Sequence, residues 1–447
     1  MLVGYNSIPS VLNIDPSFVE DEVEYVVIAI APNAFKGCMG LNSITIPKSV
    51  ALIGEHAFEE CKGLTTITLP DSIMKIGKEA FKDCEGLTKT IYEGDIESWC
   101  NIQFEKDGKD HNIAKLNDIY NIWLSMDASN PTAFSKNLYI GNKLLTDLVI
   151  PNSVTSIGIY QFSGLSRLAT VTIPDSINSI GIRAFAGCKG LMKTMYEGSI
   201  ESWCNIQFEG YCSNPASLSK NLYIDNKLLT DLVIPNSVTS IGNRAFEGCE
   251  GLTSITIPNS VKNIGDRAFA DCTGLTSITI SNGVTSIGTS AFEGCKSLTS
   301  ITIPNSVKSI GQFTFSGCTS LTSVTIPNGV TSIEAATFKG STRLTSVTIS
   351  KSVTSIEAGA FEDCTELTSV TIPNSVTSIE KEAFNGCTNL SIHIPFSVKK
   401  IGQDAFKDCK EVSYSALFEA SANKGEIILT IIFVTIILLF LAFLGLL

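Results

Sequence analysis

The chain has 447 residues, of which 44% are hydrophobic and only 17% are charged. This much apolar material excludes a disordered chain, because its burial can offset the entropy lost on ordering. The net charge of −12 argues against nucleic acid as a ligand, since phosphate binding needs clustered Lys and Arg. Three histidines leave little material for imidazole catalysis or metal sites.

The chain opens with residues 1–40, which predict a degraded first rung of a repeat that ends in NAFKGC at 33–38. From 41 to 410 a unit of 23 residues recurs, which predicts a repeat solenoid. Leu252, for example, opens LTSITIPNSVKNIGDRAFADCTG. Positions are counted below as offsets from this leucine, which is offset 0. The recognisable units begin at Leu41, Leu64, Leu145, Leu168, Leu229, Leu252, Leu275, Leu298, Leu321, Leu344, Leu367 and, in a copy one residue short, Leu390.

Each unit can be interpreted physically. Apolar residues at offsets 0, 3 and 5 predict a short strand whose alternate side chains face inward. Pro follows in most units and ends the strand, and Val-x-x-Ile supplies a second inward pair. Gly at offset 13 predicts a corner with unusual backbone angles. Ala-Phe and then Cys are expected to fill the remaining interior from a single helical turn.

Two columns of identical residues follow from this repeat. Phe at offset 17 predicts an aromatic spine stacked along the core. Cysteines at offset 20 are interpreted as free, buried thiols, because parallel side chains suit the disulfide dihedral poorly and Leu165 and Ser341 interrupt the column. The cysteines of this column are Cys38, Cys61, Cys84, Cys188, Cys249, Cys272, Cys295, Cys318, Cys364, Cys387 and Cys409.

The pattern LxxIxIPxSVxxIGxxAFxGC resembles the BspA-like leucine-rich repeats, a family of surface proteins in bacteria and some protists. The resemblance covers roughly residues 18–410 and agrees in register at dozens of positions. It implies a leucine-rich repeat solenoid with parallel β-strands and 23-residue rungs. It also implies adhesion, or binding to proteins of a host or neighbour, whereas the periodicity indicates only the solenoid.

Two variant modules, at 88–144 and 192–228, interrupt the period. YEGDIESWCNIQFE (92–105) and YEGSIESWCNIQFE (196–209) are near-identical, which indicates a tandem duplication. Each is expected to contain a short amphipathic helix and then a hairpin, with Gly141-Asn142 or Asp225-Asn226 at its turn. Trp99 and Trp203 are interpreted as core residues that pin a lengthened rung to its neighbours, with ligand recognition as the alternative.

Offsets 2 and 4 should point outward along the strand face, and six successive rungs place Ser and Thr there. Three interpretations stay open: hydroxyls tolerated on an exposed strand, a broad surface that binds protein or glycan, and a template for ice. These candidate partner-binding residues, called the hydroxyl lattice below, are Ser254, Thr256, Ser277, Thr279, Ser300, Thr302, Ser323, Thr325, Ser346, Thr348, Ser369 and Thr371.

No catalytic, cofactor or metal site is predicted. There is no Walker A pattern, G-x-S-x-G elbow, HExxH or credible Cys-His pair, so the chain is not expected to be an enzyme. Acid pairs such as Glu59/Glu60 fall on the variable outer turn, where solvated charge is expected. Glu334, Glu357 and Glu380 replace the offset-13 glycine in consecutive rungs and are expected at an exposed corner, with a bridging cation as the alternative.

After a linker at 411–426, the uncharged segment Ile427–Leu447 has the length and composition of one transmembrane helix. The start of the chain has neither the basic residues nor the continuous apolar stretch of a secretory signal. A lone hydrophobic end is typical of a tail anchor with cytoplasmic repeats, whereas the family resemblance implies repeats outside the cell. A GPI signal fits less well, and an incomplete gene model is the remaining explanation.

These observations together predict a non-enzymatic, membrane-anchored leucine-rich repeat protein. Its expected partners are a protein or glycan ligand and the membrane, with surface adhesion as the expected role. The alternative is a cytoplasm-facing, tail-anchored interaction scaffold.

Overall fold

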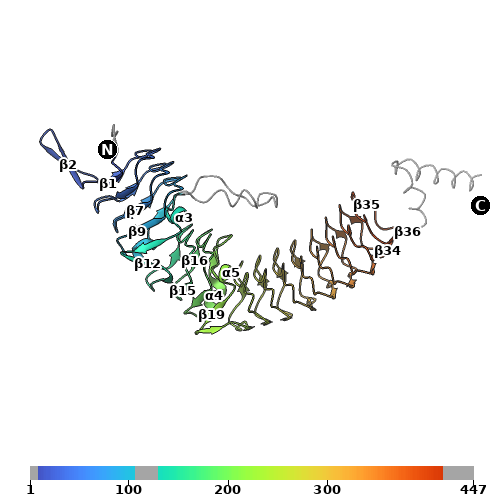
Figure 1. Cartoon of the computed structure of the whole chain (residues 1–447). Helices are drawn as coiled ribbons and strands as arrows, with labels where there is room; N and C mark the ends of the chain where they lie inside the picture. Colours follow the sequence, from blue (N-terminus) through green and yellow to red (C-terminus); the bar gives the residue numbers. More distant parts are fainter. Residues whose placement is uncertain (1–8, 106–128, 416–447) are drawn as a thin grey trace, which may run out of the picture. The chain divides into compact units, whose positions relative to one another are not determined.

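The computed structural model describes residues 9–105 and 129–415, and these divide into two compact units. Unit 1 comprises the described residues of Met1–Leu229 and Gly242–Gly251, and unit 2 those of Thr230–Ile241 and Leu252–Leu447. In each unit short strands are stacked rung upon rung, as Figure 1 shows. The predicted parallel-strand solenoid is therefore confirmed.

Unit 1 holds two pairs of sheets and an amino-terminal hairpin. The first pair follows the orders β1-β5-β7-β9-β11-β12 and β10-β8-β6-β4, and the second β13-β15-β17-β19-β20 and β14-β16-β18. The strands are β1 (Val11–Asn13), β4 (Ala29–Ile30), β5 (Ser43–Thr45), β6 (Leu52–Ile53), β7 (Thr66–Leu69), β8 (Lys75–Ile76), β9 (Lys89–Tyr92), β10 (Gln103–Phe104), β11 (Leu138–Ile140), β12 (Lys143–Leu144), β13 (Asp147–Val149), β14 (Ser156–Ile157), β15 (Thr170–Ile173), β16 (Ser179–Ile180), β17 (Lys193–Tyr196), β18 (Gln207–Phe208), β19 (Leu222–Ile224) and β20 (Lys227–Leu228), with the hairpin β2 (Ser17–Glu20) and β3 (Val23–Val26).

Unit 2 repeats the same two-sheet plan. Its longer strands form the orders β21-β23-β25 and β28-β30-β32-β34-β36, and its two-residue strands form β22-β24-β26-β27 and β29-β31-β33-β35. The bounds are β21 (Asp231–Val233), β22 (Ser240–Ile241), β23 (Ser254–Ile257), β24 (Asn263–Ile264), β25 (Ser277–Ile280), β26 (Ser286–Ile287), β27 (Ser309–Ile310), β28 (Ser323–Thr325), β29 (Ser332–Ile333), β30 (Ser346–Thr348), β31 (Ser355–Ile356), β32 (Ser369–Thr371), β33 (Ser378–Ile379), β34 (Ser391–Ile394), β35 (Lys400–Ile401) and β36 (Glu411–Tyr414).

Register along the solenoid joins each residue to its counterpart one rung away. Ser254 pairs with Ser277 and Ile255 with Ile278, so inward residues stack on inward residues. Leu252, Ile257 and Val261 are wholly buried, as the alternation of apolar residues predicts. With this register, residues at the same offset of successive rungs lie next to one another along the stack.

The predicted aromatic spine is confirmed. Phe292 and Phe315 stack with ring centroids 5.7 Å apart, Phe315 and Phe338 at 5.5 Å, and Phe361 and Phe384 at 5.0 Å. The interplanar angles of these three pairs are 3°, 11° and 9°, so the rings are stacked nearly parallel to one another. Each ring therefore buries its faces against those of the adjacent rungs.

Many thiols of the cysteine column donate hydrogen bonds to backbone carbonyl oxygens of the phenylalanine column. The cysteines of the described chain are free, and most are buried. The Cys364 thiol donates to the carbonyl oxygen of Phe338 at 3.2 Å, and the Cys318 thiol to that of Phe292 at 3.2 Å. Ser341, which interrupts the column, donates from its hydroxyl to Phe315 at 2.9 Å. In these rungs the side chain at offset 20 thus links the rung to the spine of the preceding one.

The expected role of the offset-13 glycine needs correction. Gly311 has no left-handed backbone angle, but a Cβ there would lie 2.5 Å from the backbone nitrogen of Thr289. Close approach of the preceding rung, not the corner conformation, requires glycine here. Most of the left-handed glycines stand at offset 19, for example Gly294 and Gly317, both with φ of 69°. The expected helical turn around Ala-Phe is formed by tight turns with no assigned helix.

The two variant modules contain the expected short helix and hairpin, and each adds a second short helix that was not expected. The helices are α1 (Ile96–Cys100) and α3 (Thr132–Ser135) in the first, and α4 (Ile200–Asn205) and α5 (Ala216–Ser219) in the second. Capping boxes begin α1 at Asp95 and α4 at Ser199. Strands β11 and β12, and likewise β19 and β20, pair antiparallel as hairpins.

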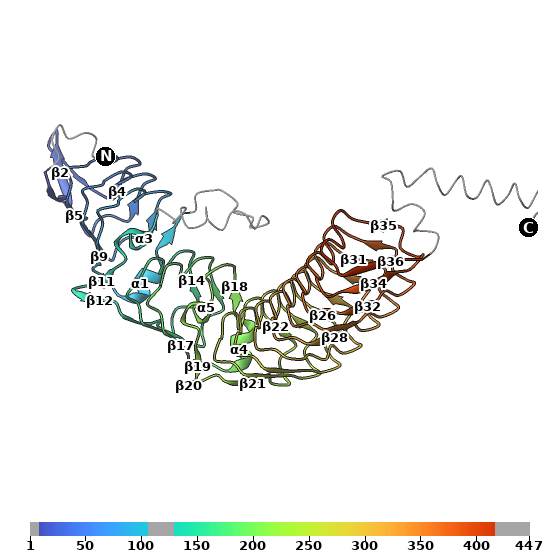
Figure 2. The ribbon, with the colours of Figure 1, turned by 45° about the vertical axis from the view of Figure 1, so that its right-hand side comes forward.

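The tryptophans of these modules are core residues, as predicted. Trp99 and Trp203 are both wholly buried. The Trp99 Nε1 donates to the carbonyl oxygen of Gln161 at 2.9 Å, and the Trp203 Nε1 to that of Ala245 at 2.7 Å. Each indole therefore fastens its module to the turn of a later rung within unit 1, which leaves the ring unavailable to a ligand. Figure 2 shows the backbone of the modules, with α1 in the first and α4 in the second.

The predicted carboxyl-terminal transmembrane helix is not retained. The longest helix in the described ranges is α4, with six residues, and none there is long and apolar enough to cross a bilayer. The segment Ile427–Leu447 lies outside the described residues. The fold is therefore corrected to a leucine-rich repeat solenoid without an assigned membrane span.

Candidate functional site

The hydroxyl lattice lies on the outward face of the longer strands of unit 2. Ten of its members alternate with the buried residues of β23, β25, β28, β30 and β32. The other two, Ser300 and Thr302, lie outside the assigned strands, and Ser300 forms an isolated bridge to Ser323. All twelve side chains are exposed except that of Ser254, which is half-buried. The inference that offsets 2 and 4 point outward is therefore correct for every lattice residue.

A neighbouring column of threonines, at offset 1, behaves differently. The Thr276 hydroxyl donates to the backbone carbonyl of Thr253 at 3.1 Å, and Thr345 donates to Thr322 at 3.0 Å. Thr253, Thr322 and Thr368 make the same bond to the rung before them. These hydroxyls are occupied in fastening rungs together, so we assign them a structural role.

The lattice hydroxyls, in contrast, are unoccupied within the described chain, with the exception of that of Ser254. Ser254 donates to Asp231 at 2.5 Å, but the lattice residues from Thr256 to Thr371 form no side-chain hydrogen bond with any described residue. Eleven exposed hydroxyls therefore form a regular array whose donors and acceptors face outward. A parallel sheet spaces them about 4.8 Å apart from rung to rung.

Ionisable side chains lie next to the array at its two ends. Asp231 precedes Ser254 in the ladder, and the hydrogen bond from Ser254 lowers the pKa of the Asp231 carboxyl. At the other end Thr371 pairs with His393, whose Nδ1 lies 3.1 Å from the Ser413 hydroxyl. The lattice itself carries no ionisable group, so any ligand must be bound through hydrogen bonds and contact.

A cluster that the sequence interpretation missed lies in unit 1. His56, Glu59 and Glu79 place one potential ligand atom each within 4.8 Å of one another. Glu59 was expected to be solvated but is only 6% exposed, because Lys36 from the preceding rung pairs with it at 2.6 Å. Burial raises the Glu59 pKa, but this ion pair and His56 outweigh it and lower the pKa overall.

Two lysines make this cluster a poor metal centre. Lys82 pairs with Glu79 at 2.8 Å, and Lys36 already occupies Glu59. A cation would have to displace both ammonium groups. The sequence could have indicated this cluster only through the register, because His56 and Glu79 both stand at offset 15 and therefore lie side by side in successive rungs.

Glu334, Glu357 and Glu380 are half-buried, not fully exposed as expected for an open corner. Glu380 pairs with Lys400 at 2.8 Å. Among the described residues these three carboxylates do not form a group suited to a metal ion.

The buried thiols give no support to catalysis. Burial raises the pKa of Cys318 to about 12 and that of Cys204 to about 12. A thiol with such a pKa is protonated at neutral pH and is a poor nucleophile.

Comparison with known protein families finds one matching repeat family. A model of the BspA type leucine rich repeat region matches residues 28–124, 132–223, 216–307 and 285–413. The chain belongs to this family. BspA-type repeat proteins are involved in protein binding and surface adhesion, and they are generally non-enzymatic. Comparison with curated proteins yields no match.

Solved structures include several similar leucine-rich repeat proteins. One from Bacteroides ovatus is 27% identical, with 94% of this chain and 91% of that one covered and a TM-score of 0.42. A leucine rich cell surface protein from Faecalibacterium prausnitzii is 26% identical over 77% of this chain and 89% of that one, with a TM-score of 0.47. One from Eubacterium ventriosum is 22% identical over 94% of both chains, with a TM-score of 0.50, and supports the fold alone.

Proposed function

We propose that this BspA-type protein is a non-enzymatic cell-surface adhesin that binds protein or glycan through its hydroxyl lattice. The observation that carries the proposal is the contrast between two threonine columns of unit 2. The offset-1 hydroxyls are bonded to the preceding rung, whereas eleven lattice hydroxyls face outward with no partner in the described chain. A surface of this kind suits a ligand with many hydroxyl or amide groups, because each contact is an exchangeable hydrogen bond.

The test is a binding measurement on an array of defined oligosaccharides and purified extracellular proteins. Thr279→Asp with Thr302→Asp places two charges within the lattice, and Asn282→Asp with Asn305→Asp places two on exposed turns of the same two rungs. We expect the threonine pair to lower affinity for an array ligand at least tenfold and the asparagine pair to leave it unchanged. Equal effects of the two pairs would contradict binding by the lattice.

Location is tested separately, by protease treatment of intact cells with an antibody against residues 252–389. Surface exposure predicts digestion without lysis. Protection until lysis would place the repeats inside the cell and would overturn the adhesin.

A further inference from the structure

In each variant module the strand face of unit 1 carries a row of paired apolar residues that the lattice lacks. In the first, Tyr139 of β11 pairs with Ile91 of β9 on one side and Leu144 of β12 on the other. Directly paired residues place their side chains on the same face of a sheet. The three therefore form a short apolar row, and all three are half-exposed.

The second module builds the same row. Tyr223 of β19 pairs with Met195 of β17 and with Leu228 of β20. Leu228 is 37% exposed, and Met195 and Tyr223 are half-exposed. Each row interrupts an outward face that elsewhere carries mainly polar residues, such as Ser43 and Thr66 on β5 and β7.

A lysine stands over the tyrosine in both rows. The Lys89 Nζ lies 4.5 Å from the ring centroid of Tyr139, and the Lys193 Nζ lies 5.5 Å from that of Tyr223. Lys143 and Lys227, near the hairpin tips, are also exposed, but they pair with Ile140 and Ile224 and so lie on the opposite face of each hairpin from the tyrosine. We call each set on the outward face a Tyr–Lys row: Ile91, Tyr139, Leu144 and Lys89 in the first, and Met195, Tyr223, Leu228 and Lys193 in the second.

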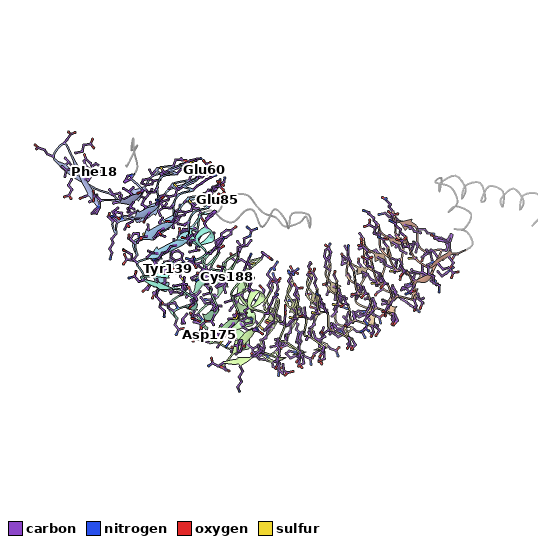
Figure 3. The ribbon with its side chains drawn as sticks, viewed as in Figure 1. Phe18, Glu60, Glu85, Tyr139, Asp175 and Cys188 are labelled. Carbon is purple, nitrogen blue, oxygen red and sulfur yellow. The ribbon has the colours of Figure 1, made fainter. Side chains whose placement is uncertain are left out.

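The fold does not need these tyrosines. The core beneath them is filled by the adjacent Leu138 and Leu222, which are 0% and 1% exposed. Neither the Tyr139 nor the Tyr223 hydroxyl forms a hydrogen bond with the described chain. Figure 3 shows Tyr139 on the side of unit 1 that bears the longer strands, away from Glu60 and Glu85. A half-exposed ring with a free hydroxyl and a cation above it is equipped for a ligand.

We propose that the two Tyr–Lys rows are paired subsites for an anionic polysaccharide whose carboxylates are separated by neutral sugars. This inference rests on the proposed function, because it names the ligand class of one face of the adhesin. A sugar ring packs its C–H face on the apolar row, its carboxylate pairs with the lysine of that row, and its hydroxyls bond the free phenol oxygen.

The presence of two similar Tyr–Lys rows in unit 1 favours a polymeric ligand over a globular one. Tyr139 lies on β11 of one sheet and Tyr223 on β19 of the next, in which the three ladder steps from β13 to β19 alone span roughly 14 Å. A repeating chain presents the same chemical group at both sites, whereas a globular partner presents one matching patch. Linking two weak sites through one ligand raises affinity without any new contact.

Negative charge on the protein limits how many carboxylates a bound polymer can carry. Asp147, on β13 between the two rows, accepts hydrogen bonds from Thr170 at 2.7 Å and Thr146 at 2.9 Å. Its carboxylate would repel a polymer charged at every sugar. The net charge of −12 acts in the same direction. A polymer in which acidic sugars alternate with neutral ones carries half as many carboxylates past Asp147 as a polymer charged at every sugar, and it still brings a carboxylate to each lysine.

The experiment uses hyaluronan, in which uronate alternates with a neutral sugar, as a long polymer and as tetrasaccharides. Calorimetry on the full chain should detect two equivalent tetrasaccharide sites, and a polymer that binds at least 100-fold more tightly. Tyr139→Ala should reduce the stoichiometry from two to one with unchanged tetrasaccharide Kd, and should remove the polymer's advantage. Tyr139→Ala with Tyr223→Ala should abolish binding.

The control variant is Tyr25→Ala, which removes a 46%-exposed tyrosine from the amino-terminal hairpin, outside both rows. It should leave both stoichiometry and affinity unchanged, and circular dichroism should show that every variant is folded. Absence of hyaluronan binding, equal binding of neutral dextran, or retained binding in the double tyrosine variant would each overturn the inference.

Failure of this inference can be distinguished from failure of the proposed function. The lattice variants Thr279→Asp and Thr302→Asp lie in unit 2, whereas both rows lie in unit 1. If they abolish binding of an array ligand while the tyrosine variants have no effect on hyaluronan, the adhesin stands and the Tyr–Lys rows are not its subsites.

Discussion

Cys364→Ser and Cys364→Ala separate two roles of the cysteine column, since serine keeps a donor at this position and alanine removes it. The Cys364 thiol donates to Phe338, whose carbonyl also accepts the backbone N–H of Ser341 at 3.0 Å. Only one acceptor site therefore loses its partner in the alanine variant, which costs about 1 kcal/mol. The deleted sulfur leaves a small void that costs about 1 kcal/mol more. We expect Cys364→Ala to lose about 2 kcal/mol and Cys364→Ser less than about 1 kcal/mol.

Ser341 offers the reverse experiment in the same column. Ser341→Cys should be nearly neutral, because the thiol replaces a hydroxyl that donates to Phe315, whereas Ser341→Ala should lose about 1 kcal/mol or more. Urea unfolding followed by circular dichroism gives the free energies, and hydrogen exchange at the Phe361 amide reports the local effect. If alanine is as stable as serine at both positions, the column acts by apolar packing alone, and the hydrogen-bond interpretation is refuted.

Three further predictions concern the core. Phe315→Ala should cost about 3–5 kcal/mol of unfolding free energy, because the ring is wholly buried between Phe292 and Phe338; a loss below about 1 kcal/mol would show that the spine is dispensable. Trp203→Phe should cost about 2 kcal/mol by removing the bond to Ala245 and leaving a void, and an unchanged urea midpoint would count against the pinning role. Stability should also fall above pH 9: burial raises the pKa of thiols such as Cys318 to about 12, so their contribution is complete below the unfolded pKa and is lost as the pH rises towards the folded one. Each such thiol contributes a slope of up to about 1.4 kcal/mol per pH unit, so a urea midpoint that does not change between pH 8 and pH 10 would contradict it.

The sequence predicts those features of the fold that depend on side-chain alternation within one rung. Ile255 and Ile257 had to face one way and Thr256 the other, whatever the neighbouring rungs contained. The spine was predictable because Phe recurs at one offset, and any parallel register then stacks the rings. The outward lattice followed from the same alternation.

Features that depend on two rungs at once were not predictable. Glu59 is buried because Lys36 reaches it from the preceding rung, and nothing in the local sequence around Glu59 indicates this. The role of Gly311 depends on how closely Thr289 approaches, which the repeat period does not reveal. The hairpin at Asp225-Asn226 was expected, but the pairing of Tyr223 with Met195 required the register.

The like-to-like register has a consequence for how such a molecule changes over generations. Ser300 bridges to Ser323 one rung away, and Ser323 pairs with Ser346 a further rung away. Excision of one 23-residue rung would therefore bring together residues that already occupy equivalent places, and duplication of one would do the same. Recombination between misaligned copies of the gene can thus lengthen or shorten the lattice in whole rungs without creating a mismatched interface, and the extent of the surface can be selected apart from its chemistry.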